Sequence, residues 1–354
     1  MLFTEIKEKQ SNLVYPNGYP HDRSLEQIRR KVDNAGIFVL DEQACAMAAN
    51  VSLTKPTSII ASLPFVKLPA EYTWIEIDNL AIRRATAALG SPNLKTDNAA
   101  VEIVRSAFLM YMDVDEAKGR KDLVIEYVHK DRPFSGRLPD GREAVLDLAP
   151  VIGRFSLADT DEYTPVDFPT LPRDTSIPTA GKVRQHLNLL EKDPAEAAAW
   201  KELWSRFEWR PHPDLRMLAR SFASLMGESK VAMVEDDQGD ELRRMFVTQI
   251  LSALILLNCR NAVTTERVPA PERLNKKRLK QKRAPIPEYR TVKVHLSGAA
   301  KRAWSERGLS SSQVRDGAFV VGHFKVRKSG IYWWGFHMRG GGPSSTRRIG
   351  VITA

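Results

Sequence analysis

Cysteine is scarce in this sequence, and its two cysteines, Cys45 and Cys259, lie far apart along the chain. They form no C-x-x-C pair, which disfavours both a disulfide framework and a cysteine-based zinc site. This sparing use of cysteine suits a reducing compartment. We therefore expect a cytoplasmic protein.

Long hydrophobic runs are also missing. The longest apolar stretch, residues 245–259, is about four or five residues shorter than a membrane span, and Thr248, Gln249 and Ser252 interrupt it. The first residues lack the basic-then-apolar layout of a signal peptide. We expect a buried helix at 245–259 and no membrane partner.

The motifs that mark common enzymes and cofactor sites are absent from the sequence. There is no Walker A loop and no Rossmann fingerprint. Asp113 and Asp115 precede a glycine as in an EF-hand, but Lys118 occupies the position that needs the glycine. We expect no cofactor and no metal, and the absence of these motifs favours a protein that is not an enzyme.

Positive charge is present in excess but is unevenly distributed. The chain has 354 residues and a formal net charge of +10. Residues 264–354 hold 20 Lys and Arg against 5 Asp and Glu, a net charge of +15, whereas the remainder holds 33 against 38, a net charge of −5. The last quarter therefore carries the excess, which favours a polyanionic partner.

The pattern of hydrophobic residues predicts an α+β protein in four parts. We expect a mixed α+β domain at 1–180, a helical segment at 181–263, a basic linker bounded by prolines at 264–288, and a small, basic, β-rich module at 289–354.

Several elements can be placed within these parts. Helices are predicted from the capping box at Ser24, over 42–50, and from Asp193 with Pro194 at its first position. We expect Trp200, Leu203, Trp204, Phe207 and Trp209 to pack from this last helix. The apolar 245–259 helix should lie at the centre of a helical bundle. Strands are predicted at 72–77, 144–148, 289–296 and 348–353, a short helix at 299–306, and a long hairpin over 101–128, with a helix at 98–112 as the alternative.

A dense basic run occupies residues 273–283 of the expected linker. Its cations are Arg273, Lys276, Lys277, Arg278, Lys280, Lys282 and Arg283. Seven like charges cannot neutralise one another, so they face either water or phosphates. A solvated linker and an anionic membrane surface are the alternatives to nucleic acid.

A predicted hairpin over 319–337 joins cations with aromatic rings. Lys325 and Arg327 line its incoming strand, and Tyr332 and Trp334 lie on the outgoing one, with Arg339 beyond. Such a surface suits single-stranded nucleic acid, whose backbone is held by charge and whose bases stack on rings. The alternative is that the rings belong to the core. Adjacent Trp333 and Trp334 should point to opposite faces, so at least one is expected to be buried.

The same hairpin carries two histidines. With a turn centred on Ser329 and Gly330, His323 and His337 would lie almost opposite each other. Two imidazoles beside a cation could share acid and base roles in metal-free RNA cleavage. A change of register by one residue would separate them, and structural or phosphate-binding histidines are the simpler interpretation.

The C-terminal motifs resemble a group of uncharacterised proteins encoded by phages and prophages. The resemblance covers residues 272–340 and rests on Asn275-Lys276-Lys277-Arg278, Gly322-His323-Phe324-Lys325, Gly330, Trp333-Trp334 and His337-Met338-Arg339-Gly340. Phe336 stands where these proteins carry a proline. The resemblance implies an origin in a mobile element and a location in a bacterial host cell.

These observations predict a phage-type accessory protein that binds DNA or RNA without catalysing a reaction. The basic run and the rings of the hairpin should then share one exposed surface. A ribonuclease using His323 and His337 is one alternative. The other is a protein that recognises a host protein through its acidic N-terminal part.

Overall fold

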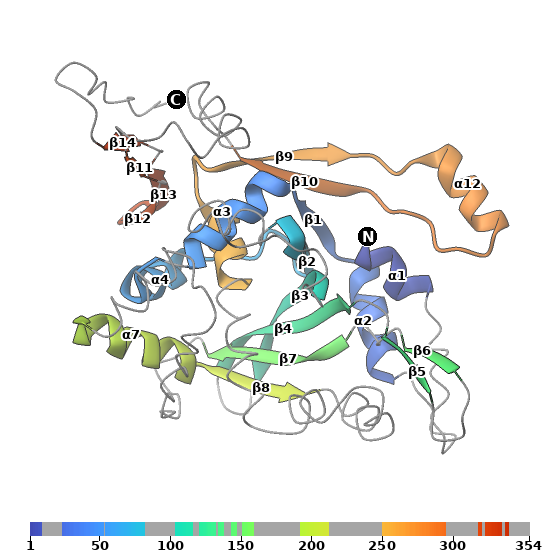
Figure 1. Ribbon diagram of the computed structural model, residues 1–354, viewed down its shortest axis with the longest axis horizontal. Helices are drawn as coiled ribbons and strands as arrows, with labels where there is room; N and C mark the ends of the chain where they lie inside the picture. The colour runs from blue at the N-terminus through green and yellow to red at the C-terminus, as the bar shows by residue number, and fades with distance from the viewer. Residues whose placement is uncertain are drawn as a thin grey trace.

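A computed structural model describes residues 1–8, 23–52, 54–81, 103–115, 120–131, 134–137, 143–146, 151–158, 192–211, 250–294, 318–320, 323–334 and 337–339. Its main feature is an eight-stranded sheet with the order β8-β7-β4-β3-β2-β1-β10-β9 (Figure 1). The strands are β1 (Gly36–Leu40), β2 (Thr73–Asp78), β3 (Ile103–Asp115), β4 (Arg120–Asp131), β7 (Val151–Ala158), β8 (Phe207–Pro211), β9 (Val263–Val268) and β10 (Tyr289–Val294). β1 runs parallel to β2 and β10, and the other pairs are antiparallel.

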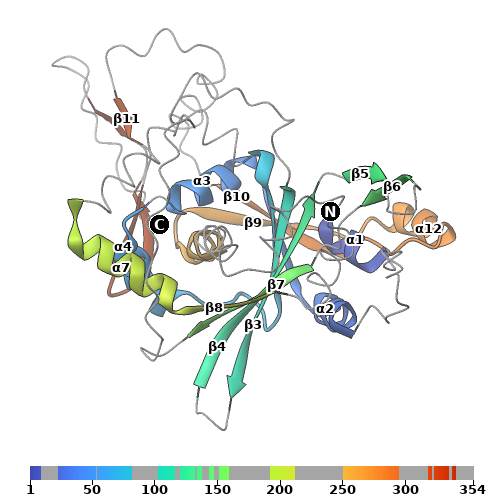
Figure 2. The same ribbon diagram turned by 60° about the horizontal axis from the view of Figure 1, so that its bottom comes forward.

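Helices cover the sheet, and the α+β class predicted from the sequence is confirmed. The helices are α1 (Leu2–Glu8), α2 (Arg23–Asp33), α3 (Glu42–Ser52), α4 (Pro56–Ser62), the 3-10 turn η1 (Leu63–Phe65), α7 (Pro194–Ser205), a helix over 250–258, and α12 (Glu272–Lys280). Figure 2 shows α1 and α2 on one side of the sheet and α3 on the other. No helix in these stretches is long and apolar enough to cross a membrane.

Side chains alternate along the strands, so each face of the sheet has its own hydrophobic cluster. Trp74 and Leu109 pack with α1 and α2, whereas Ile75 and Phe108, their neighbours in sequence, pack on the opposite face. This follows from the two-residue period of a strand. The long hairpin of β3 and β4 shows the same alternation, which confirms the predicted hairpin, and residues 103–112 of the alternative helix are strand.

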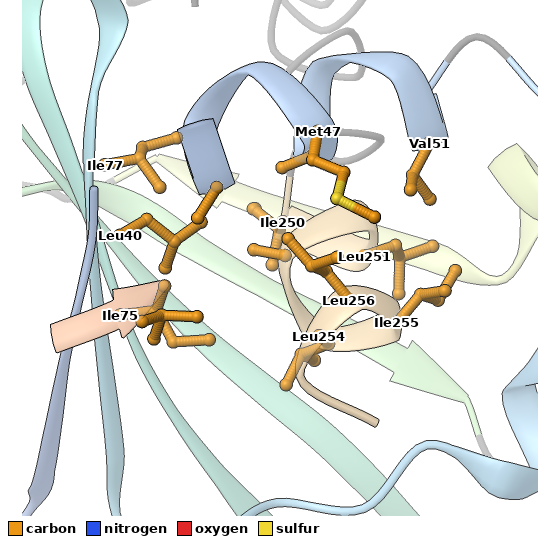
Figure 3. Packing of buried hydrophobic residues seen from close by; sticks show 14 of the residues in the cluster. Leu40, Met47, Val51, Ile75, Ile77, Ile250, Leu251, Leu254, Ile255 and Leu256 are labelled. Atoms are coloured by element: carbon orange, nitrogen blue, oxygen red, sulfur yellow. The ribbon is translucent and has the colours of Figure 1, made fainter. Parts of the chain in front are cut away.

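The predicted buried helix is present at 250–258, but its surroundings differ from the prediction. Every residue from Ile250 to Leu256 is buried. Figure 3 shows Met47 of α3 on one side of this helix and Ile75 and Ile77 of the sheet on another. A helix that is apolar all round needs partners on every side. Here the sheet supplies one of those sides, so the helix does not lie at the centre of a helical bundle.

The predicted α7 begins as expected and ends early. Asp193 Oδ1 accepts a hydrogen bond from the main-chain N–H of Ala195 at 3.1 Å, which satisfies one of the free donors of the first turn. Trp200 and Leu203 are buried, as predicted. The helix stops at Ser205, and the next residues form β8 on β7. The prediction that Phe207 and Trp209 belong to the helix is therefore wrong.

The first strand of the expected C-terminal module belongs to the main sheet. β10 was expected in the module at 289–354, yet it lies between β1 and β9 in the main sheet. In this position β10 pairs with the edge of β1 that β2 leaves open. It also buries its own side chains Val292 and Val294. The expected basic linker at 264–288 contains most of β9 and the whole of α12, so this stretch has regular secondary structure.

Other predictions fall partly or wholly outside the described residues. The strand predicted at 144–148 corresponds to β6 (Glu143–Leu146), which pairs with β5 (Phe134–Arg137). The helix predicted at 299–306 and the strand predicted at 348–353 lie outside them.

Candidate nucleic-acid interface

The basic run lies in an arm made of β9, α12 and β10, residues 263–294. Figure 1 shows β9 and β10 as a two-stranded ribbon with α12 beyond its far end. Two cations of the ribbon are paired with acids, and a third, Arg290, lies over the ring of Phe38. Lys293 lies 2.5 Å from Glu266, and Arg267 lies 2.6 Å from Glu288. The excess of positive charge in the arm therefore concentrates at α12.

One side of α12 is fastened to the returning chain. The Asn275 side chain accepts a hydrogen bond from the N–H of Ile286 at 2.7 Å and donates one to its carbonyl oxygen at 2.8 Å. Arg278 donates to the carbonyl oxygen of Ala284 at 2.8 Å. It also forms an ion pair with Glu8 at the end of α1. This side of the helix therefore has a fixed position.

The other side of α12 presents a strip of cations that we call the cationic face: Arg273, Lys276, Lys277 and Lys280. Their spacing is i, i+3, i+4, i+7, so they fall within about 100° of arc on a helix of 3.6 residues per turn. Asn275 and Arg278 each lie about 150° from the middle of this arc, one on either side of the opposite direction. The sequence pattern predicted the cations but not their gathering on one side.

The cationic face has no acidic counterpart in the part of the chain that the structure describes. All four side chains are exposed, and none is within an ion-pair distance of a described carboxylate. Lys282, just beyond the helix, is exposed too. The remaining two cations of the run differ, because Arg278 and Arg283 both pair with Glu8. Five of the seven predicted contacts thus remain available to a polyanion.

The second predicted region is a hairpin of β12 (His323–Arg327) and β13 (Gly330–Trp334). Phe324, Ile331 and Trp333 are buried on one face and join the main cluster. We call the opposite face the outer face. It carries Lys325, Arg327, Tyr332 and Trp334. Trp333 and Trp334 therefore point to opposite faces, as predicted, and Trp333 is the buried one.

The outer face holds an accessible ring among cations. Trp334 is 37% exposed. Lys325 Nζ lies 4.1 Å from the centroid of its ring, and Arg327 Cζ lies 5.7 Å away. Both distances are within the range of cation–π attraction. Charge and ring are thus held together as stacking surfaces for nucleic acid require.

Sequence reasoning missed Arg260, which lies beside the outer face. It directly follows the buried helix and lies 72 positions before Tyr332, yet Arg260 Nη1 is 3.4 Å from Tyr332 Oη. Tyr332 Oη is also 3.0 Å from Ser329 Oγ. The hydrogen bond with Ser329, followed by the charges of Arg260 and Arg327, lowers the pKa of Tyr332. No local pattern in the sequence signals this contact, because it arises from tertiary packing.

The predicted pairing of His323 with His337 is wrong. The turn occupies Lys328 and Ser329, one residue earlier than expected, so His323 lies opposite Trp334. His337 and Arg339 belong to β14 (His337–Arg339), which pairs with β11 (Ala318–Val320), and His337 lies opposite Val320. A turn shifted by one residue moves every cross-strand pair by two positions. The side chains of His323, His337 and Arg339 lie outside the described residues.

The cationic face and the outer face are separate surfaces. Figures 1 and 2 place α12 and the β12–β13 hairpin at opposite ends of the molecule. The expectation that they form one surface is therefore wrong. The arm joins the main sheet where β10 pairs with β1, whereas the hairpin contacts the end of the buried helix through an isolated bridge between Ile331 and Cys259.

Within the described ranges, no group of three or more His, Cys, Asp or Glu side chains is placed to hold a metal ion. Comparison of the chain with protein-family models, with curated proteins and with solved structures gives no match.

Proposed function

We propose that this chain is a phage-type accessory protein that binds nucleic acid without catalysing a reaction, and that α12 makes the main contacts with the phosphate backbone. The observation that carries the proposal is the cationic face. It places four exposed, unpaired cations of the described chain on one side of a helix whose other side is fastened.

Without a bound anion, the spacing of these cations destabilises α12. Arg273 and Lys277 are four residues apart, as are Lys276 and Lys280, and such like-charge pairs destabilise an isolated helix by about 0.2–0.5 kcal/mol each. A row of phosphates offsets this repulsion and releases its condensed counterions. Arg267 and Lys293 of the ribbon differ from the cationic face, because acids within the same arm neutralise them.

The chemistry of the cationic face favours recognition that does not depend on base sequence. Lysines and arginines that meet phosphates position a protein on nucleic acid but do not read bases. Asn275 carries the one amide side chain of α12, and both its polar atoms bond to Ile286 rather than facing a base edge. We infer that α12 binds the backbone of any sequence.

The test is the salt dependence of binding. Fluorescence anisotropy with a labelled duplex would give the affinity of the wild type and of K276Q/K280Q over a range of salt concentrations. Each lost phosphate contact should lower the slope of log K against log[salt] by about 0.9, so the double variant should lose about 2. K67Q/K192Q is the matched control, because it removes the same charge at exposed positions outside the arm. An unchanged slope in K276Q/K280Q would refute the proposal.

A further inference from the structure

The hairpin and the residues before it form a surface that α12 does not explain. Arg260 lies at Tyr332 Oη, and Lys325 and Arg327 lie over the exposed ring of Trp334. Among the described large hydrophobic residues that are exposed, Trp334 is the only aromatic one. Packing in the hydrophobic core does not explain why a tryptophan is kept at the surface beside several cations.

The backbone under this surface is fixed. Asn261 Oδ1 accepts a hydrogen bond from the N–H of Trp333 at 2.7 Å, and Asn261 Nδ2 donates to its carbonyl oxygen at 2.9 Å. The N–H of Arg260 donates to the carbonyl oxygen of Ile331 at 3.1 Å. With Phe324 and Trp333 buried beneath, the strand cannot turn over. Trp334 is thus held outward before any ligand arrives, which lowers the entropic cost of binding.

The charged part of the surface suits a phosphate. Arg260 Nη1 lies 3.4 Å from Tyr332 Oη, which also bonds to Ser329, and Arg327 is close enough for its charge to act on this tyrosine. No described carboxylate forms an ion pair with Arg260, Lys325 or Arg327. Guanidinium groups and hydroxyls are donors that match phosphate oxygens. An anionic ligand would meet donors here and no opposing acid.

We propose that this surface is a second nucleic-acid site that takes a single-stranded segment, with a phosphate between Arg260 and Arg327 and a base stacked on Trp334. The inference rests on the proposed function but assigns a different site and a different form of the ligand. In a duplex the faces of the bases are covered by their neighbours, so only an unpaired base offers its face to Trp334. The five-residue strands extend over roughly 17 Å, which is enough for a few nucleotides.

The experiment compares two probes on the full chain. Fluorescence anisotropy would measure binding of a labelled oligothymidine of about 12 nucleotides and of a short labelled duplex. W334A should weaken oligothymidine binding by about 5- to 150-fold, since stacking of one base contributes roughly 1–3 kcal/mol. W334F should recover most of that loss because it keeps a ring. Duplex binding should change less than twofold in both variants.

The phosphate part of the site has its own variants. R260Q should weaken oligothymidine binding and lower its salt slope by about 0.7, the value for one contact with a single strand. R260K keeps the charge but loses the planar fork, so it should recover the slope and only part of the affinity. K276Q/K280Q should affect the duplex much more than the oligothymidine. Thermal unfolding of each variant checks that the fold is retained.

The outcomes separate the two proposals. Oligothymidine binding that W334A and R260Q leave unchanged would overturn the second site, and the role of α12 would stand if K276Q/K280Q still weakened the duplex. Oligothymidine binding that needs Trp334, together with duplex binding that K276Q/K280Q leaves unchanged, would support the second site and refute the role proposed for α12. Equal loss of both probes in W334A would show a single shared site and overturn the inference.

Discussion

Glu8, the last residue of α1, forms an ion pair with Arg278 of α12, although 270 positions separate them in the sequence. Both side chains are largely buried, with 18% and 11% of their surfaces exposed. Glu8 also reaches Arg283. The N-terminal helix therefore holds the arm in place and neutralises part of its charge.

Replacing Glu8 by Gln should change stability and binding in opposite directions. Loss of the carboxylate leaves Arg278 without its charged partner and should lower the free energy of unfolding by about 1–3 kcal/mol. It also frees positive charge beside the cationic face, so affinity for a duplex should rise. Urea unfolding and anisotropy would measure the two effects. E71Q removes one charge at an exposed site and should alter neither, whereas reduced affinity in E8Q would contradict the prediction.

Replacing Asn261 by Ala should loosen the hairpin. The side chain satisfies both main-chain groups of Trp333, and their loss should lower the free energy of unfolding by about 1–3 kcal/mol. Oligothymidine binding should weaken as well, because Trp334 is no longer held outward. N34A is the matched control, since Asn34 is exposed and donates one hydrogen bond to Arg30. A similar stability for N261A and N34A would count against the role given to Asn261.

Gly330 begins β13 with a φ of 136°, a conformation that other L-residues rarely adopt. A Cβ atom there would also come within 3.2 Å of Arg260 Nε. G330A should therefore lower the free energy of unfolding by about 1–3 kcal/mol. The double variant R260A/G330A removes the contact but keeps the backbone strain. A double variant as stable as R260A alone would show that strain is not the cause.

Cys45 and Cys259 should be unreactive in the folded protein. Burial raises the pKa of each thiol from 9.0 to about 12, so few thiolates exist near neutral pH. The aromatic disulfide reagent used for thiol counting should label neither residue at pH 8 until urea is added. The raised pKa also means that unfolding releases protons above pH 9.0, so stability should fall as pH rises from there toward 12. Rapid labelling of the native protein would show that these thiols are accessible.

RNA incubated with the protein should remain uncut by any reaction that needs both histidines. His323 lies opposite Trp334 and His337 opposite Val320, so the backbone does not place the two residues across from each other. Gel analysis of a labelled RNA should give the same result for the wild type and for H323A/H337A. Cleavage by the wild type that each single variant abolishes would restore the ribonuclease hypothesis.

Local patterns predicted the local structure well. The capping signal at Ser24 falls in the first turn of α2, and the proline after Asp193 is the first residue of α7. Two apolar, β-branched segments around a polar turn predicted the hairpin of β3 and β4. These features depend on neighbours in sequence. The same holds for the opposite orientations of Trp333 and Trp334, which follow from the period of a strand.

Contacts between distant segments could not be read in this way. Prolines at 269, 271, 285 and 287 indicated a linker, but they flank a helix that Asn275 and Arg278 fasten to residues 284–286 and to Glu8. Arg260 reaches Tyr332 only because the buried helix ends beneath the hairpin. The turn at Lys328 and Ser329 decided the histidine register, and its position depends on a glycine with positive φ at 330 rather than within the turn.

The position of β10 between β1 and β9 has a consequence for how the chain acquires its structure. During synthesis, β1 emerges from the ribosome about 250 residues before β10, the second strand that pairs with it. Until then its edge is open to wrong partners, and a fragment ending near residue 180 would keep that edge permanently exposed. We expect such a fragment to aggregate. In the full chain, the sheet should be completed only after β10 has left the ribosome.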